Sequence, residues 1–178
     1  MKIICTKSNL VKGVNIVSKA VPSKTTMPIL ECILIDATTD IIKLTANDME
    51  LGIETRVEGD ILEHGKIALD AKLFSEITRR LSSENASVTI ESDDKFNTTI
   101  RCENSVFNIQ GRDGEEFAYL PYIEKDKYIC LSQFTLKEVI QQTIFSIAPN
   151  DSNKMMAGEL FEVNENQLKV VSLDGHRI

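Results

Sequence analysis

Hydrophobic and polar residues alternate with a helical period in two segments of the chain. The first segment begins at a cap formed by Ser8 or Asn9 and ends at the Val21–Pro22 pair, because the residue before a proline disfavours helical geometry. One face of this helix is apolar and the opposite face is polar: Leu10, Val14, Val17 and Val21 against Ser8, Lys12, Asn15 and Lys19. The pattern therefore predicts an amphipathic helix with lysines on its solvent face.

The second helix is predicted over Ala71–Leu81. Its apolar residues are expected to face inward and its polar residues outward: Leu73, Phe74, Ile77 and Leu81 against Lys72, Ser75, Glu76 and Arg79. For one helix alone, a solvated face is the plainer explanation of such charges. Because the second helix repeats the division of the first, we expect the two helices to share one basic surface.

Short segments with the alternation of strands occupy most of the remaining chain up to residue 110. They are predicted at Lys2–Thr6, Leu30–Asp36, Ile41–Ala46, Gly52–Glu58, Lys66–Asp70, Ser87–Ser92, Phe96–Cys102 and Val106–Gln110. Polar pairs such as Asp93–Asp94 join neighbouring strands as hairpin turns. This order predicts an α+β fold, with antiparallel sheets and two helices per domain on one side. Residues 111–127 have no clear period, and we interpret them as a linker.

The end of the chain repeats the pattern of its beginning. Leu168–Asp174 follows the apolar and polar order of Ile42–Asp48 at an offset of 126 residues. At the same offset, the apolar stripe of the first helix matches a stripe in a helix predicted at Phe134–Ala148: Leu136, Ile140, Thr143 and Ile147. A repeat of this length indicates duplicated domains rather than a solenoid of short units.

The second copy starts at Tyr128, and the sequence reaches Ile178 straight after the Asp174–Gly175 turn. Few finished domains stop on an apolar residue at such a place, so we expect the sequence to stop inside a domain. Phe145 falls on the polar side of the predicted helix, and the sequence offers no explanation for it.

Composition limits the classes of protein to consider. With 42% hydrophobic and 26% charged residues, the chain is not disordered, and no apolar run approaches the roughly 18 residues of a membrane helix. The N-terminus lacks the layout of a signal peptide. The four cysteines are scattered in strand-like segments: Cys5, Cys32, Cys102 and Cys130. These features predict a cytoplasmic protein with reduced core thiols, without disulfides or zinc.

The charge of the chain is unevenly distributed. The net charge is −7, yet the two predicted helices and the loop after the first carry six basic residues against the single acid Glu76: Lys12, Lys19, Lys24, Lys72, Arg79 and Arg80. The acidic excess must therefore lie elsewhere in the chain. Such a split suits a protein that is basic on its helices and acidic elsewhere.

Catalysis is not indicated by any motif. The sequence has no Gly-rich phosphate loop and no His-Glu-x-x-His, and His64 and His176 are too poorly flanked for a metal site. Asp93–Asp94 is better explained as a turn, and Asp174 with His176 has no nucleophile nearby. We therefore predict a protein that is not an enzyme and that needs no cofactor.

Three sequence features resemble one family when they are taken together. Leu173–Ile178 carries Asp-Gly-His-Arg after a strand, Met27–Leu30 carries a Pro-Ile-Leu turn, and Phe145–Ala148 precedes a polar loop. Taken in the order of the chain, over all 178 residues, they resemble the bacterial replicative sliding clamp, the beta subunit of DNA polymerase III. The resemblance implies residues 1–120 as a first clamp domain, 121–127 as a linker and 128–178 as the first half of a second domain.

The resemblance also implies the role of the protein and its partners. Clamps of this family are homodimer rings that encircle double-stranded DNA without sequence preference and tether the replicative polymerase. The positions that match DNA contacts of the family are Lys24, Lys72, Asn150, Lys154 and Met155. At Lys154 and Met155 the sequence departs from family members that carry tyrosines which stack on DNA. Alongside Lys24 and Lys72, the basic pattern of the helices adds Lys12 and Arg79 as expected phosphate contacts.

Polymerase and clamp-loader subunits of such clamps dock a short peptide in a groove. The positions that match its near wall are Met156, Leu173, Gly175, His176, Arg177 and Ile178. The matching place in the first copy, after Asp48, has Met49–Leu51 and no Gly-His-Arg. The copy without these residues is expected to keep the fold, which favours a local task for them in the other copy.

A second interpretation remains open from the residues alone. The chain could be a small acidic protein-interaction module without a DNA role, or an uncharacterised enzyme, whose helices are simply solvated. The salt dependence of non-specific DNA binding separates this alternative from a clamp, because neutralised phosphates release counterions.

Overall fold

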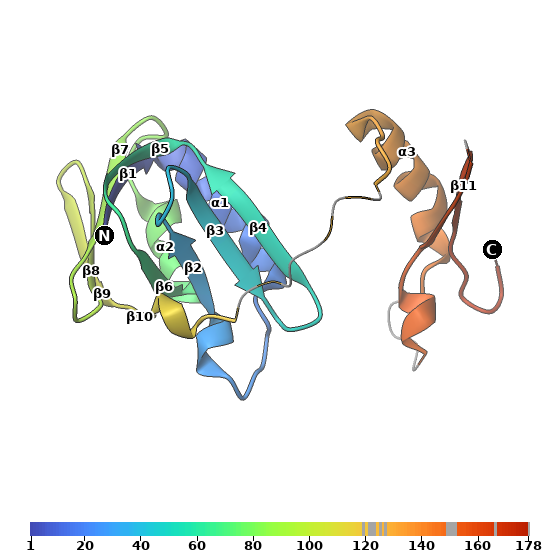
Figure 1. Ribbon diagram of the computed structural model, residues 1–178, viewed down its shortest axis with the longest axis horizontal. Coiled ribbons are helices and arrows are strands. Elements are labelled where there is room, and N and C mark those ends of the chain that lie inside the picture. Colours follow the sequence, from blue (N-terminus) through green and yellow to red (C-terminus); the bar gives the residue numbers. More distant parts are fainter. Residues whose placement is uncertain are drawn as a thin grey trace. The chain divides into compact units, whose positions relative to one another are not determined.

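The computed structural model describes residues 1–118, 120, 124, 126, 128–148, 153–165 and 167–177, apart from the side chain of Lys154. It divides into two compact units, unit 1 over Met1–Tyr122 and unit 2 over Ile123–Ile178 (Figure 1). No helix formed by the described residues is long and apolar enough to cross a membrane.

Unit 1 contains two antiparallel sheets. The first has the order β5-β1-β7-β8-β9, formed by Gly59–Glu63, Lys2–Thr6, Ser87–Ser92, Asn97–Cys102 and Ser105–Gln110. The second has the order β10-β6-β2-β3-β4, formed by Arg112–Asp113, Lys66–Asp70, Cys32–Asp36, Ile42–Asn47 and Gly52–Val57. The predicted α+β fold with antiparallel sheets is confirmed.

Two helices pack on these sheets, and Figure 1 shows them side by side. Helix α1 spans Lys7–Val17 and continues as the 3-10 turn η1 at Ser18–Ala20, while α2 spans Ala71–Arg80. The predicted cap at Ser8 or Asn9 was wrong. Thr6 caps α1, because it ends β1 in an extended conformation and its hydroxyl accepts a hydrogen bond from the Asn9 amide at 3.2 Å.

The core lies where both helices meet both sheets. Leu10, Val14 and Val17 of α1 are buried as predicted, and so are Phe74 and Ile77 of α2. Burying such side chains contributes about 1.5–3 kcal/mol each to folding. The helical faces thus fix how α1 and α2 sit on the sheets.

One inward-facing residue was predicted wrongly. Leu73 is 44% exposed, whereas Thr78 is buried. The buried stripe of α2 runs through Phe74, Ile77, Thr78 and Leu81, a spacing of three and four residues that leaves Leu73 on its flank. Hydrophobicity alone misplaced this residue, because the phase of the helix decides which side chains are covered.

Two parts of unit 1 were missed by the strand pattern. Edge strand β5 has mostly exposed side chains, so only its pairing with β1 identifies it as a strand. The predicted linker from residue 111 instead begins with β10, which pairs with β6, and with the 3-10 turn η3 at Gly114–Glu116. Phe117 is buried against Cys32, Leu34 and Ala68, so this segment belongs to unit 1.

The start of β2 also differs from the prediction. The strand expected from Leu30 begins at Cys32, because Pro28–Glu31 forms the 3-10 turn η2, which has proline in its first turn. Proline is common in the first turn of a helix, because it has no backbone N–H and the N–H groups of that turn have no partner within the helix.

Unit 2 repeats part of unit 1 in the described residues. Helix α3 spans Gln133–Thr143, and the 3-10 turns η4 and η5 span Ile144–Ser146 and Lys154–Ala157. These bounds lie 126 residues after those of α1, η1 and η2. Helix α3 therefore ends earlier than predicted, at the same 3-10 turn as its counterpart.

The strand hairpin of unit 2 is duplicated as well. Strands β11 and β12 span Leu160–Asn164 and Gln167–Val171, and Leu160 pairs with Val171. In unit 1 Leu34 pairs with Thr45, the same register at the same offset. Helix, turns and strand register thus all repeat, and the predicted duplication is confirmed.

The cysteines follow the prediction with one exception. Cys5, Cys32 and Cys102 are buried, and burial raises the pKa of the Cys5 thiol to about 12. Cys130 is exposed and lies outside the described strands, although its counterpart Ile4 lies in β1. The expectation of a fourth core thiol was therefore wrong, because no described strand of unit 2 pairs there. None of the four, all in the described part of the chain, forms a disulfide.

Candidate nucleic-acid and peptide interfaces

The outer faces of α1 and α2 join into one polar surface. Asn15 Oδ1 accepts a hydrogen bond from Arg79 Nη2 at 3.4 Å, and the hydroxyls of Ser18 and Ser75 lie 3.3 Å apart. Around these bridges the basic side chains are exposed. We call this surface the helical face: Lys12, Asn15, Lys19, Lys72, Ser75 and Arg79. The predicted shared basic surface is present in unit 1.

The two bridges also give the direction of the helices. Ser18 follows Asn15 along α1, whereas Ser75 precedes Arg79 along α2, so the helices run antiparallel. Lys72 therefore lies level with the end of α1, where the chain enters the loop that carries Lys24. Both lysines are exposed, so the helical face continues toward this loop.

An open cleft of about 350 Å³ lies at the other end of the helical face. Its lining includes Lys7, Lys12, Arg79 and Glu84. Lys7 is already engaged, because its Nζ donates to the carbonyl oxygens of Leu81 and Ser82 at 2.5 and 3.1 Å. It therefore satisfies the C-terminal end of α2, while Lys12 and Arg79 project their charges toward solvent.

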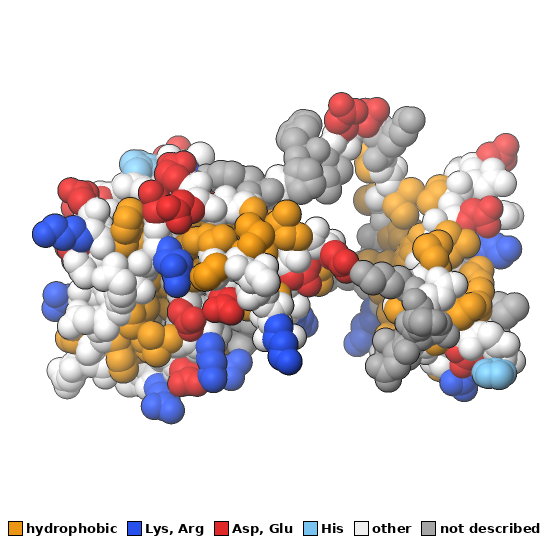
Figure 2. Space-filling model, turned by 90° about the horizontal axis from the view of Figure 1, so that it is seen from below, with side chains coloured by type: hydrophobic (Ala, Val, Ile, Leu, Met, Phe, Trp, Pro, Cys, Tyr) orange, Lys and Arg blue, Asp and Glu red, His pale blue; other side chains and the backbone are white. Residues whose placement is uncertain are grey.

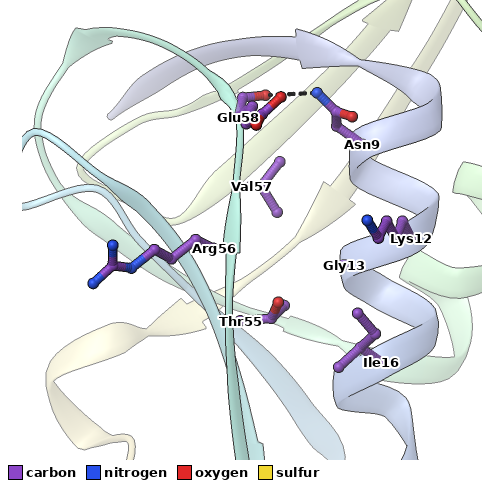
Figure 3. Close-up of a pocket in the computed structure, with 8 residues that line it drawn as sticks. All are labelled: Asn9, Lys12, Gly13, Ile16, Thr55, Arg56, Val57 and Glu58. Carbon is purple, nitrogen blue, oxygen red and sulfur yellow. Dashed lines mark hydrogen bonds between the residues drawn. The ribbon is translucent and has the colours of Figure 1, made fainter. Parts of the chain in front are cut away.

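A smaller cleft separates α1 from edge strand β4. It has about 160 Å³ and is lined by Asn9, Lys12, Gly13, Ile16 and residues of the strand (Figure 3). A Cβ at Gly13 would lie 2.8 Å from Val57 Cγ2, so glycine allows the close approach of helix and sheet. Arg56 points away from the helix in Figure 3. The cleft is below the 300–1,000 Å³ typical of small-molecule sites.

Each of the two histidines, His64 and His176, has a backbone or turn partner near it. His64 Nδ1 lies 2.9 Å from the carbonyl oxygen of Ala37, and the exposed His176 donates its amide to Asp174. Within the residues that the structure describes, no three His, Cys, Asp or Glu side chains gather as a potential metal site.

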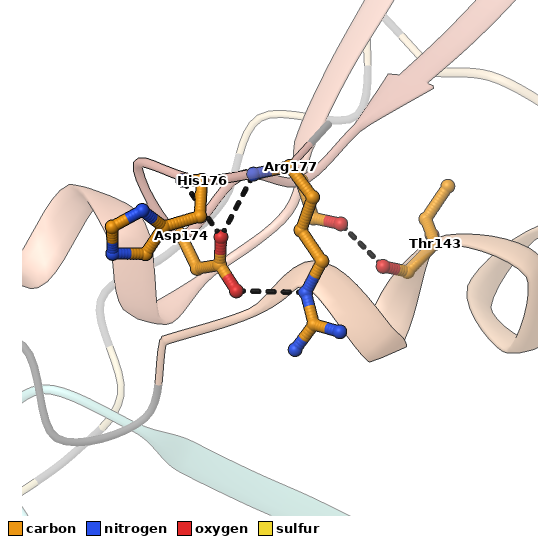
Figure 4. A network of polar contacts seen from close by, with 5 residues as sticks. Thr143, Asp174, His176 and Arg177 are labelled. Atoms are coloured by element: carbon orange, nitrogen blue, oxygen red, sulfur yellow. Dashed lines mark hydrogen bonds and ion pairs between the residues drawn. The ribbon is translucent and has the colours of Figure 1, made fainter.

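The Asp-Gly-His-Arg segment forms a tight turn after β12. Asp174 Oδ1 accepts hydrogen bonds from the amides of His176 and Arg177, both at 3.0 Å (Figure 4). Asp174 Oδ2 lies 2.8 Å from Arg177 Nε. Gly175 has a φ of +82°, a conformation that glycine adopts without strain. Hydrogen bonds to the Asp174 carboxyl, first from the His176 amide and then from Arg177, hold its pKa below its usual value.

The other predicted groove residues are distributed around this turn and η5. Met156 is half-buried, and its carbonyl oxygen accepts a hydrogen bond from the Ala148 amide at 2.9 Å. Leu173 is 37% exposed, and Gly175, His176 and Arg177 are exposed. Ile178 lies outside the described residues.

Two of the predicted DNA contacts in unit 2 cannot be placed. Asn150 and the side chain of Lys154 lie outside the described residues. Met155 is 85% exposed in η5, beside the half-buried Met156. Neighbouring methionines thus point one side chain to solvent and the other toward the body of unit 2.

Sequence reasoning missed the contact between Phe145 and Arg177. Phe145 is 57% exposed in η4, and the guanidinium carbon of Arg177 lies 5.8 Å from the centre of its ring. This distance is within the range of cation–π contacts. The signal was an aromatic residue on a polar helical side, but its partner is 32 positions away and only the fold brings the two together.

Comparisons with known proteins agree with the duplicated architecture. Residues 1–121 match the model of the DNA polymerase III beta subunit, N-terminal domain, and residues 130–178 match that of its central domain. A beta sliding clamp from Halalkalibacterium halodurans is 37% identical, and one from Bacillus subtilis is 36% identical. All of this chain aligns with 48% of the first relative and 49% of the second.

Solved structures give the same picture. A crystal structure from Eubacterium rectale, described as a DNA polymerase III beta subunit, is 66% identical with a TM-score of 0.92, and the sliding clamp of Bacillus subtilis is 34% identical with a TM-score of 0.89. Each alignment covers 99% of this chain and 48% of the other. The chain thus spans about half the length of the relatives that it matches. The family is one of processivity factors rather than enzymes. With both domain models matched in order, the chain belongs to the DNA polymerase III beta subunit family, the bacterial sliding clamps.

Proposed function

We propose that this chain supplies the DNA-facing helices and one partner-binding wall of a sliding clamp. In this proposal two full-length chains close a ring around duplex DNA in the cytoplasm, and the ring keeps the replicative polymerase on its template. The observation that carries it is the helical face, in which exposed lysines and an arginine of two helices lie together although the chain has a net charge of −7.

The chemistry of the helical face suits contact with phosphates. Long, solvated side chains such as Lys12, Lys72 and Arg79 attract the DNA backbone without reading base edges. Sliding requires weak attraction of this kind, since strong or base-specific contacts would hold the ring in one place. The ring itself then provides the lasting attachment, so an overall acidic protein is compatible with the task.

DNA binding by the full-length protein tests this part of the proposal. We expect Lys12→Ala, Lys24→Ala, Lys72→Ala and Arg79→Ala each to weaken binding modestly and to reduce the salt slope by about 0.9 for each phosphate that is no longer neutralised. Lys95→Ala is the matched control, because Lys95 is exposed in the β7–β8 turn rather than on a helix. A variant that changed sequence preference, or slopes that equal that of the control, would exclude a clamp.

The second part of the proposal is a peptide groove in unit 2. Its near wall would consist of the residues that the family resemblance indicates: Met156, Leu173, Gly175, His176, Arg177 and Ile178. The methionine adapts its shape to different partners, and the arginine offers an apolar stem with a charged end. Polymerase and clamp-loader subunits would dock short peptides there.

The duplicate surface of unit 1 supports this groove. Asn47, the counterpart of Leu173, donates a hydrogen bond to the Ala118 carbonyl oxygen at 2.7 Å. Leu120 lies against Gly52, the counterpart of Ile178, so closely that a Cβ there would overlap its Cδ2. A segment of the chain itself therefore covers in unit 1 the surface that we assign to a peptide in unit 2.

A peptide that ends in Leu and Phe tests the groove. We expect it to bind full-length protein at micromolar strength, and Arg177→Ala to cost about 1 kcal/mol, which is roughly a fivefold loss of affinity. Arg101→Ala, at an exposed position of β8, is the matched control. Equal affinities of both variants, with folding intact, would place the peptide site elsewhere.

A further inference from the structure

A single carboxylate holds both the backbone and the side chain of Arg177. One oxygen of Asp174 accepts the amides of His176 and Arg177 at 3.0 Å, and the other lies 2.8 Å from Arg177 Nε. Figure 4 shows the guanidinium held on the Nε side, with both Nη groups pointing away from the carboxylate. The carboxylate thus limits the rotamers of a long side chain that exposed positions usually leave mobile.

An aromatic ring limits the same side chain from a second direction. Phe145 belongs to η4, directly after α3, and its ring centre is 5.8 Å from Arg177 Cζ. The end of α3 is joined to the segment directly after β12, because Ser172 Oγ donates a hydrogen bond to the Thr143 carbonyl oxygen. The ring and the turn therefore belong to one connected structure, which fixes the ring relative to Arg177.

The duplicate turn in unit 1 shows that the fold does not need this arrangement. Asp48 Oδ1 accepts hydrogen bonds from the amides of Glu50 and Leu51 at 2.9 and 2.7 Å. Asp174 likewise accepts from the amides two and three residues after it. At the positions of Arg177 and Phe145, unit 1 has Leu51 and Lys19. Because the turn forms without the arginine and the ring, their pairing in unit 2 serves something other than the turn.

We propose that Asp174 and Phe145 are positioning residues that preorganise Arg177 for a peptide ligand. The inference rests on the peptide groove proposed above. With Nε engaged by Asp174, the Nη groups of Arg177 are left to donate to a carbonyl or carboxylate oxygen of the peptide. A side chain already held in place loses less conformational entropy on binding, so the ligand binds more tightly than it would to a mobile arginine.

Two conservative substitutions in the full-length protein test the proposal. Asp174→Asn keeps an oxygen that accepts the two amides but removes the charge beside Nε, and Phe145→Leu keeps an apolar side chain without the ring. The probe is the peptide that ends in Leu and Phe. We expect each substitution to weaken its binding about twofold to fivefold, the cost of ordering one long side chain and no more than the loss caused by Arg177→Ala. Phe145→Tyr should keep the affinity of the wild type.

A double-mutant comparison separates positioning from a structural effect. In an Arg177→Ala background, Asp174→Asn and Phe145→Leu should have no further effect on affinity, because the residue that they position is absent. Asp48→Asn and Phe134→Leu are the matched controls, and they should leave affinity unchanged. Losses that add to that of Arg177→Ala would overturn the proposal.

A measurement without ligand gives an independent readout. NMR relaxation of the Arg177 Nε–Hε group should show more order than that of the exposed Arg101, and Asp174→Asn should remove the difference. Equal mobility of the two arginines in the wild type would overturn the proposal. Absence of peptide binding by the wild type would overturn the groove itself, and with it this role of Arg177, even if the side chain is ordered.

Discussion

The turns at Asp48 and Asp174 have the same geometry but different side chains. In each, the side chain of the aspartate accepts hydrogen bonds from the amides two and three residues later. The residue directly after the aspartate has a left-handed backbone. That residue is Met49 in unit 1, with φ of +76°, and Gly175 in unit 2, with φ of +82°. The duplicated fold therefore imposes this backbone, whichever residue occupies it, and glycine only makes it less costly.

The two units differ more in what covers the hairpin beside each turn. Leu34 of β2 is 2% exposed, whereas its counterpart Leu160 of β11 is 60% exposed. In unit 1 the segment around Phe117 buries this face. At the offset of 126 residues the counterpart of Phe117 would be position 243, so the 178 residues of this sequence do not include the segment that would cover the hairpin of unit 2. Figure 2 shows hydrophobic side chains over much of the surface of unit 2 in that view.

The strongest test of this difference removes the cover. Phe117→Ala should reduce the free energy of unfolding of unit 1 by about 3–5 kcal/mol, because a fully buried phenyl ring is lost and a cavity remains. Amide hydrogen exchange in β2 and β6 measures the effect. Phe134→Ala, at a side chain that is 70% exposed in α3, should change stability by about 0.5 kcal/mol or less. Equal effects of both substitutions would contradict the assignment of residues 111–118 to the core of unit 1.

Exchange of the residues at the left-handed positions tests the turns. Met49→Gly should stabilise unit 1 by about 0.5–1 kcal/mol, since backbone strain is removed and the exposed methionine contributes little packing. Gly175→Met should destabilise unit 2 by about 1 kcal/mol for the converse reason. Chemical denaturation measures both. A loss of stability in Met49→Gly, or a gain in Gly175→Met, would show that strain does not distinguish the turns.

Rebuilding the Asp–Arg pair in unit 1 should have a smaller effect. Leu51→Arg places an arginine three residues after Asp48, as Arg177 follows Asp174. Because the position is 49% exposed, we expect stability to change by only about 0.5 kcal/mol or less. Thermal denaturation, with Leu51→Lys as control, measures the change. A gain well above this value would mean that the pair in unit 2 stabilises the fold rather than orients a side chain.

The least effect is expected from pH. Hydrogen bonds from the Leu51 and Glu50 amides hold the pKa of Asp48 below its usual 3.8, and those from His176 and Arg177 lower the pKa of Asp174. A lowered pKa in the folded state adds stability above the unfolded value, and this is lost as pH falls through the folded pKa. Melting temperatures should therefore decline below about pH 4, less steeply in Asp48→Asn. Identical profiles of variant and wild type would contradict the contribution of this carboxylate.

The sequence alone determined the elements whose residues repeat with a clear period. The stripe of α1, the stripe of α2 apart from Leu73, the bounds of β1, β6 and β7, and the offset of 126 residues were readable, because amphipathic periodicity records which side of an element is buried. The same offset located α3 and the last strand, β12. Family resemblance then supplied the candidate contacts, most of which remain predictions.

Only the tertiary structure decided the features that depend on a distant partner. Edge strand β5 is defined by its pairing with β1, and Phe117 becomes core only because β2 and β6 lie beneath it. The contact between Phe145 and Arg177 likewise joins a helix end to a turn 32 residues later. Local patterns record burial along one element. They carry no information on which other element supplies the covering atoms, and that is set when the chain folds.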